Sequence, residues 1–137
     1  MGPGSVVADN VVGGNGLDGI SLFARTHGNR VVGNGVQGNG FMGAVPGDGI
    51  RIFGGGNHIE GNRVVGNAAD GISIGRRSFA PLGSLPPPNG MGNAVRHNRS
   101  YRNGAWDLFD SNIAPPCDSN VWASNAYGTA NQPCVAS

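Results

Sequence analysis

At 137 residues, with a formal net charge of +1 and 12% charged residues, the chain has the length of one domain and no basic excess that would favour nucleic acid. No apolar run approaches the roughly 20 residues that a membrane-spanning helix needs. Glycine is abundant, at 26 residues, but the regular spacing of Val and Ile argues against a disordered chain.

The chain contains an internal repeat built on asparagine, with the signature N-x-[V/I]-x-x-N-x-x-x-x-N. Self-similarity at a roughly fixed period is typical of solenoids. A leading copy of the repeat has Ser5 in the first column, and a trailing copy has Ala130 in the third. The three asparagine columns are Asn29, Asn57, Asn93 and Asn120; Asn10, Asn34, Asn62, Asn98 and Asn125; and Asn15, Asn39, Asn67 and Asn103.

Each repeat contains three short stretches that read as strands. Alternation places Ile20 and Leu22 on one face and Ser21 on the other. Asn or Gly ends each stretch, and these residues tolerate the left-handed conformation of a tight corner. No 3.6-residue apolar period persists, so no helix is predicted. In chain order, strands are predicted around Val7, Val12 and 19–22, around Val31, Val36 and 49–52, around Ile59, Val64 and 71–74, and at 106–108.

Three strands and three corners per copy, repeated five times, predict an all-β fold: a parallel β-helix that forms a single domain over residues 1–137. Coils are expected to begin near residues 5, 29, 57, 93 and 120, with insertions at 40–47 and 76–92. The Asn amides of neighbouring coils are predicted to form internal hydrogen-bonded ladders. The alternative is that Asn only marks exposed turns.

The motif GNxVxGN…DGI resembles that of right-handed parallel β-helix repeat proteins, which are related in fold to pectate lyases and to NosD-like periplasmic proteins. It occurs in Gly28–Asn34 with Asp48–Ile50, and in Gly61–Asn67 with Asp70–Ile72. The resemblance runs from about Val6 to Val135 and implies a right-handed solenoid. Because the fold hosts lyases, hydrolases, epimerases, adhesins and binding modules, the resemblance does not specify an activity.

The last repeat is flanked by the two cysteines, Cys117 and Cys134. If they pair, they close the terminal coil over residues 117–134, which indicates an oxidising, extracytoplasmic compartment. Two free thiols in a cytosolic protein are the alternative. The closing stretch also looks like the terminal coil of secreted bacterial β-helix proteins, so an extracellular or cell-surface location is predicted.

The opposite end lacks a comparable closure. Solenoids need caps because a bare terminal coil exposes strand edges and apolar core. Nothing before Val6 resembles a cap. The sequence therefore predicts either a missing N-terminal portion or self-association through that end.

An acidic column is the best candidate for chemistry. Asp18, Asp48 and Asp70 each stand two residues before an inward Ile and would stack at one corner. Stacked like charges repel unless a cation, an Arg or a hydrogen-bond network neutralises them. Arg51 is expected to lie outward beside them, with Asp107 one coil further on.

Two interpretations of this corner stay open. The carboxylates and Arg51 would form a ligand-binding or catalytic groove for a glycan, where Arg51 contacts a uronate carboxylate. By resemblance to β-helix lyases, calcium held by Asp18, Asp48 and Asp70 would accompany an acidic polysaccharide. In the other interpretation, Asp-Gly is a turn dipeptide whose side chain caps its own backbone. No other cofactor or metal site is predicted.

Three functions compete. The first is a secreted, non-catalytic β-helix, structural or carbohydrate-binding, within a longer cell-surface protein. The second is a fragment of a polysaccharide lyase, hydrolase or epimerase that uses the acidic corner. The third, by resemblance to NosD-like proteins, is a periplasmic accessory protein for metal-centre assembly. It ranks last because few soft Met, His or Cys ligands are available.

Overall fold

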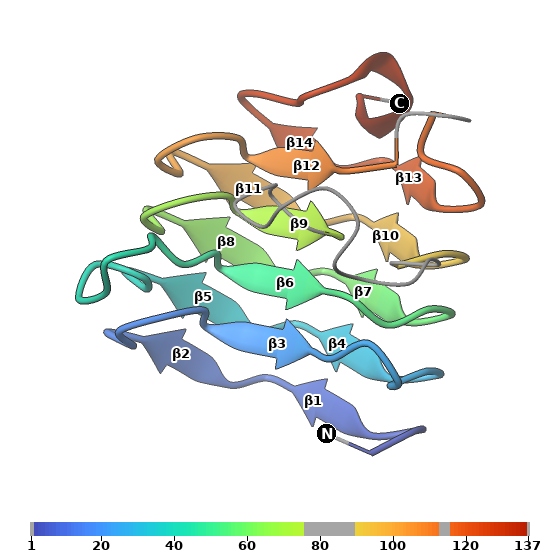
Figure 1. Ribbon diagram of the computed structural model, residues 1–137, viewed down its shortest axis with the longest axis horizontal. Coiled ribbons are helices and arrows are strands. Elements are labelled where there is room, and N and C mark those ends of the chain that lie inside the picture. Colours follow the sequence, from blue (N-terminus) through green and yellow to red (C-terminus); the bar gives the residue numbers. More distant parts are fainter. Residues whose placement is uncertain (1, 76–89, 113–115, 137) are drawn as a thin grey trace.

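The computed structural model describes residues 2–75, 90–112 and 116–136, which form a parallel β-helix with its two termini at opposite ends (Figure 1). Short strands of two or three residues form three all-parallel sheets. Sheet A contains β1 (Val6–Ala8), β4 (Arg30–Val32), β7 (His58–Glu60), β10 (Ala94–Arg96) and β13 (Val121–Ala123). Sheet B contains β2 (Val11–Gly13), β5 (Gly35–Gln37), β8 (Arg63–Val65), β11 (Arg99–Tyr101) and β14 (Ala126–Tyr127). Sheet C contains β3 (Ile20–Leu22), β6 (Ile50–Ile52), β9 (Ile72–Ile74) and β12 (Leu108–Asp110).

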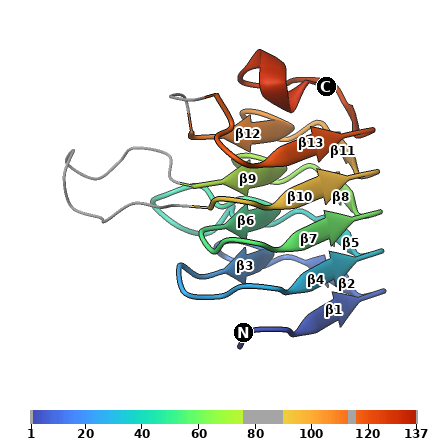
Figure 2. The same cartoon turned by 90° about the vertical axis from the view of Figure 1, so that its right-hand side faces the viewer.

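Each strand pairs with the equivalent strand of the next coil, so that equivalent side chains stack along the axis. Figure 2 shows this stacking for sheet A, from β1 to β13. The middle residue of each sheet A strand points inward, as Val31, Ile59 and Val95 do with no exposed surface. Sheet C instead turns its first and third residues inward, such as Ile50 and Ile52. The predicted alternation is confirmed, and burial of these columns supplies the apolar core.

Asparagine ladders run inside the corners, as predicted. The backbone N–H of Asn34 donates to Oδ1 of Asn62 at 2.9 Å, and Nδ2 of Asn34 donates to the same oxygen at 3.0 Å. The same double contact links Asn29 to Asn57 and Asn39 to Asn67. Because these asparagines are buried, they are ladder rungs and not merely exposed turn residues.

Insertions leave the ladders in register. Consecutive rungs of the first column are separated by 24, 28, 36 and 27 residues along the chain, yet each pair makes the same contact. The predicted insertion at 40–47 is an exposed loop that starts and ends where the backbones of Gly40 and Gly47 meet. Most of the second predicted insertion, 76–92, lies outside the described residues. Its last residues rejoin the coil, where Gly56 donates its backbone N–H to the carbonyl of Met91.

The fifth coil is shorter than the sequence predicts. Ala130 does not continue the third asparagine column but bridges Leu108 of sheet C. The corner is lost because Gly128 and Thr129, directly after β14, donate their backbone N–H groups to Oδ2 of Asp107. A three-residue 3₁₀ helix, Pro133–Val135, follows where the sequence predicts no helix. No helix of the described residues is long and apolar enough to cross a membrane.

The C-terminal coil is closed by a disulfide between Cys117 and Cys134, which are 17 residues apart in the sequence. Val135, next to the bond, is completely buried against the core. Reduction should lower the free energy of unfolding by about 3 kcal/mol, since the closed loop restricts the unfolded chain. Thermal melts followed by circular dichroism, with and without reductant, measure this. A Cys117→Ser/Cys134→Ser variant should melt at the same temperature in both buffers. If reductant does not change the melting temperature of the wild type, the disulfide does not stabilise the fold.

At the other end, β1, β2 and β3 are the terminal strands of the three sheets, and each has one neighbour within the chain. Val7 and Val12 in this first coil are only partly buried against the core. Self-association through this edge stays a prediction.

Candidate functional site

Asp18, Asp48 and Asp70 form a fourth ladder, made of aspartate, at the corner before sheet C. Oδ1 of Asp18 accepts the backbone N–H of Asp48 at 2.9 Å, and Oδ1 of Asp48 accepts that of Asp70 at 2.9 Å. Oδ1 of Asp70 accepts the N–H of Trp106 at 3.0 Å. Asp48 and Asp70 are buried, with 1% and 0% of their surface exposed. The predicted stack exists, and it is oriented along the solenoid rather than out of it.

The second carboxylate oxygens of Asp18 and Asp48 accept hydrogen bonds from a column of donors on the outer side of the strands. Oδ2 of Asp48 accepts Nε of Arg51 at 2.7 Å and the hydroxyl of Ser73 at 2.6 Å. Oδ2 of Asp18 accepts the hydroxyl of Ser21 at 2.9 Å and lies 3.5 Å from Nη1 of Arg51. An Arg and hydrogen-bond donors thus offset the repulsion between the stacked charges.

The glycine of each Asp-Gly-Ile motif is required by packing. A Cβ added to Gly49 would overlap Cγ1 of Val64 and would lie 2.7 Å from the amide nitrogen of Asn67. The motif therefore places a ladder aspartate, a close backbone contact and a core isoleucine in three consecutive positions. The aspartate caps the backbone of the next coil and not its own, which differs from an ordinary Asp-Gly turn.

The prediction that Asp107 lies one coil further on in the outward column of Arg51 is wrong. Leu108 pairs with Ile72, so Phe109 is the residue that pairs with Ser73 on the outer face. Asp107 is 3% exposed. Its Oδ1 accepts Nδ2 of Asn103 at 2.9 Å, which ends the third asparagine ladder. The shortened fifth coil has no asparagine at this corner. Its backbone N–H groups, from Gly128 and Thr129, donate to Asp107 instead and hold the side chain there.

Asp110 ends the first ladder in a similar way. It is completely buried, and its Oδ2 accepts the Nδ2 group of Asn120 at 3.1 Å and the indole N–H of Trp122 at 3.0 Å. Both carboxylates act as terminal acceptors for amide columns that run toward the C-terminus. The residue pattern does not indicate this role for either aspartate.

Metal binding has little geometric support in the part of the chain that the structure describes. There, no group of three or more His, Cys, Asp or Glu side chains is placed to hold an ion. Asp18, Asp48 and Asp70 are rungs on successive coils and do not converge on one point.

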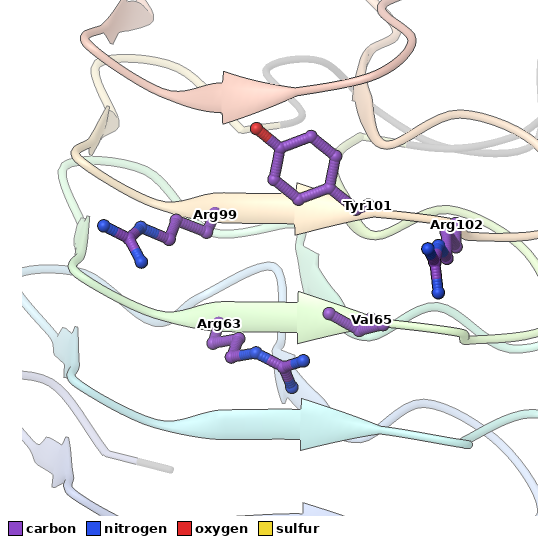
Figure 3. A pocket seen from close by; sticks show the side chains of 5 residues that line it. All are labelled: Arg63, Val65, Arg99, Tyr101 and Arg102. Atoms are coloured by element: carbon purple, nitrogen blue, oxygen red, sulfur yellow. The ribbon is translucent and has the colours of Figure 1, made fainter.

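A basic hollow lies on the outer face of sheet B. It has a volume of about 410 Å³ and is lined by Arg63 and Val65 of β8, Arg99 and Tyr101 of β11, and Arg102 of the following turn. Figure 3 shows Arg63 and Arg99 toward the beginning of their strands and Arg102 beyond their far end, with Val65 and Tyr101 in between. The three arginines are exposed, and Tyr101 is 39% exposed. This basic hollow was not among the sites that the sequence predicted.

The sequence model of a family described as "Right handed beta helix region" matches residues 1–83, more than half of the 137-residue chain. The chain belongs to this family of right-handed β-helix proteins. Searches of the curated proteins and of the solved structures returned no match. Membership of this family accounts for the right-handed β-helix fold but does not specify a function. The function must be inferred from the side chains on the outer faces of the sheets.

Proposed function

We propose that this right-handed β-helix is an extracellular, non-catalytic segment that binds carbohydrate on the outer face of sheet B. The basic hollow carries the proposal. It combines an aromatic ring, an apolar side chain and exposed hydrogen-bond donors in one concave surface. The Tyr101 ring offers an apolar face for a sugar ring, and its neighbouring arginines offer donors for oxygen atoms.

The state of the acidic corner supports binding over catalysis. Glycoside hydrolysis ordinarily uses two positioned carboxylates, one of which transfers a proton. Both oxygens of Asp18 and of Asp48 accept hydrogen bonds from the chain itself. Asp48 is also buried, so a substrate would have to displace these donors before the carboxylate met it.

The disulfide supports the extracellular assignment. Bonds of this kind persist in oxidising compartments and are rare in the cytosol. Cys117 and Cys134 are both used, and no free cysteine is found among the described residues. Rigid ladders and a closed end also suit a segment that must survive outside the cell.

Incubation with immobilised acidic and neutral glycans, with and without calcium, tests this function. We expect the protein to be retained on at least one glycan, with no change in glycan chain length and no unsaturated product. Retention should not depend on calcium. Cleavage that disappears in Asp48→Asn would contradict the proposal and establish the enzyme hypothesis, whereas the absence of retention on every glycan would remove the binding role.

A further inference from the structure

We propose that the basic hollow selects polyanionic glycans, whose carboxylate or sulfate groups are bound by Arg63, Arg99 and Arg102. This inference rests on the proposed carbohydrate-binding function and specifies its ligand class. It assigns binding to sheet B, away from the acidic corner of sheet C.

The first support is a pair of like charges. Arg63 and Arg99 are register partners on neighbouring parallel strands. Like charges directly opposite each other destabilise a sheet. Neither Arg63 nor Arg99 forms an ion pair with a carboxylate in the part of the chain that the structure describes, so no acid there offsets the repulsion. Anionic groups bound to the two guanidinium groups would supply that compensation.

The second support is a side chain at a position that glycine occupies in the three preceding coils. Arg102 has a φ of +58°, in the left-handed region. In the three preceding coils the equivalent residue, between the sheet B strand and the asparagine, is Gly14, Gly38 or Gly66, each also at positive φ. A side chain is disfavoured in this conformation, and the turn itself does not need one. Asp9, His97 and Ser124 adopt the same conformation at the preceding corner, so what distinguishes Arg102 is its place in the lining of the hollow with Arg99 and Tyr101.

The third support is the shape around the arginine pair. Gly35 precedes Arg63 in this outward column, and Ala126 follows Arg99. These small residues leave the surface open in both directions along the solenoid axis. Neighbouring strands lie about 4.8 Å apart, so Arg63 and Arg99 can meet successive anionic groups of an extended chain. The planar guanidinium fork matches the oxygens of a carboxylate or sulfate.

A sugar polymer fits the hollow better than nucleic acid does. Single-stranded nucleic acid is bound by a series of aromatic rings along a strongly positive groove. Here Tyr101 is the one aromatic residue lining the hollow, and the net charge of the chain is +1. An oligonucleotide nevertheless serves as the decisive competitor in the test.

Affinity for four probes tests the ligand class: polygalacturonate, dextran sulfate, unmodified dextran and a single-stranded oligonucleotide. We expect at least one of the two anionic glycans to bind at least about 10-fold more tightly than dextran, with affinity that falls as salt is raised. The carboxylate and sulfate probes identify which anion is preferred. Equal affinity for dextran would overturn the anion selectivity but leave carbohydrate binding intact. Tightest binding of the oligonucleotide would overturn the glycan assignment.

Variants locate the site. Arg102→Gly should weaken polyanion binding about 3- to 10-fold while the melting temperature stays the same or rises, because glycine relieves the backbone conformation. A purely structural residue would not give this combination. Arg63→Gln/Arg99→Gln should weaken binding further. The matched control Arg30→Gln/Arg96→Gln removes two exposed arginines from sheet A, and an equal loss of binding there would overturn the site.

Discussion

Replacing Asn62 with alanine should lower the free energy of unfolding by about 4 kcal/mol, because the change interrupts the central rung of a buried ladder. Oδ1 of Asn62 accepts both the backbone N–H and Nδ2 of Asn34. Its Nδ2 donates to the carbonyl of Val31 at 2.8 Å and to Oδ1 of Asn98 at 2.9 Å. Asn62 is 1% exposed, so water cannot replace these partners without opening the coil.

Asn10→Ala is the matched control in the same column. Asn10 also donates to the next rung, Asn34, but it lies at the exposed end of the ladder. Its replacement should cost under about 1 kcal/mol, since solvent can satisfy the groups it leaves. Chemical denaturation followed by far-ultraviolet circular dichroism compares the two variants. Equal midpoints for Asn62→Ala and Asn10→Ala would show that the internal ladder contributes little. If Asn62→Ala fails to fold, Asn62→Asp, which keeps the acceptor and removes the donor, gives the comparison.

Asp48→Ala should be destabilising by about 3 kcal/mol or more, since it removes the central carboxylate of the aspartate ladder. The change leaves the buried backbone N–H of Asp70 and the hydroxyl of Ser73 without this acceptor, and it leaves Arg51 without its closest carboxylate. Asp48→Asn should cost less because its oxygen can still accept the Asp70 N–H. The control Glu60→Ala removes an exposed acid from β7 and should change stability little.

The same variants separate a structural role from a ligand-binding role. Folded Asp48→Asn protein should bind an acidic glycan as the wild type does, because the proposed ligand lies on sheet B. Loss of glycan binding in a variant with an unchanged circular dichroism spectrum would instead place the ligand at the acidic corner.

The fold could be predicted because its contacts repeat. Asn34 and Asn62 stand at the same distance in sequence from the inward Val or Ile residues that flank them, although an insertion separates the two repeats. Residues that keep the same spacing in every repeat are expected to occupy the same position in every coil. The third strand of each repeat could also be predicted, because apolar and polar residues alternate along it, as they do in Ile50–Ile52. The fifth coil could not be predicted, because Asp107 replaces the missing asparagine corner through contacts to backbone amides that no residue pattern encodes.

The candidate site was predicted only in part, because the sequence indicates where a side chain lies along the repeat but not which groups it forms hydrogen bonds with. The stack of Asp18, Asp48 and Asp70 was visible in the sequence, but the direction of Oδ1 toward the next coil was not. The basic hollow was not predicted because a concave surface also depends on how Val65, Tyr101 and Arg102 lie around the arginine pair, and the repeat does not specify this arrangement. Arg63 and Arg99 directly follow Asn62 and Asn98 of one predicted asparagine column, so the sequence already implied that these two arginines are neighbours.

A crystal structure with a bound acidic oligosaccharide tests the central claim most directly. The ligand is expected on the outer face of β8 and β11, with its anionic groups against Arg63, Arg99 and Arg102 and a sugar ring on Tyr101. Ligand density along the outer face of β3, β6 and β9, with Arg51 turned away from Asp48 to meet it, would contradict the account.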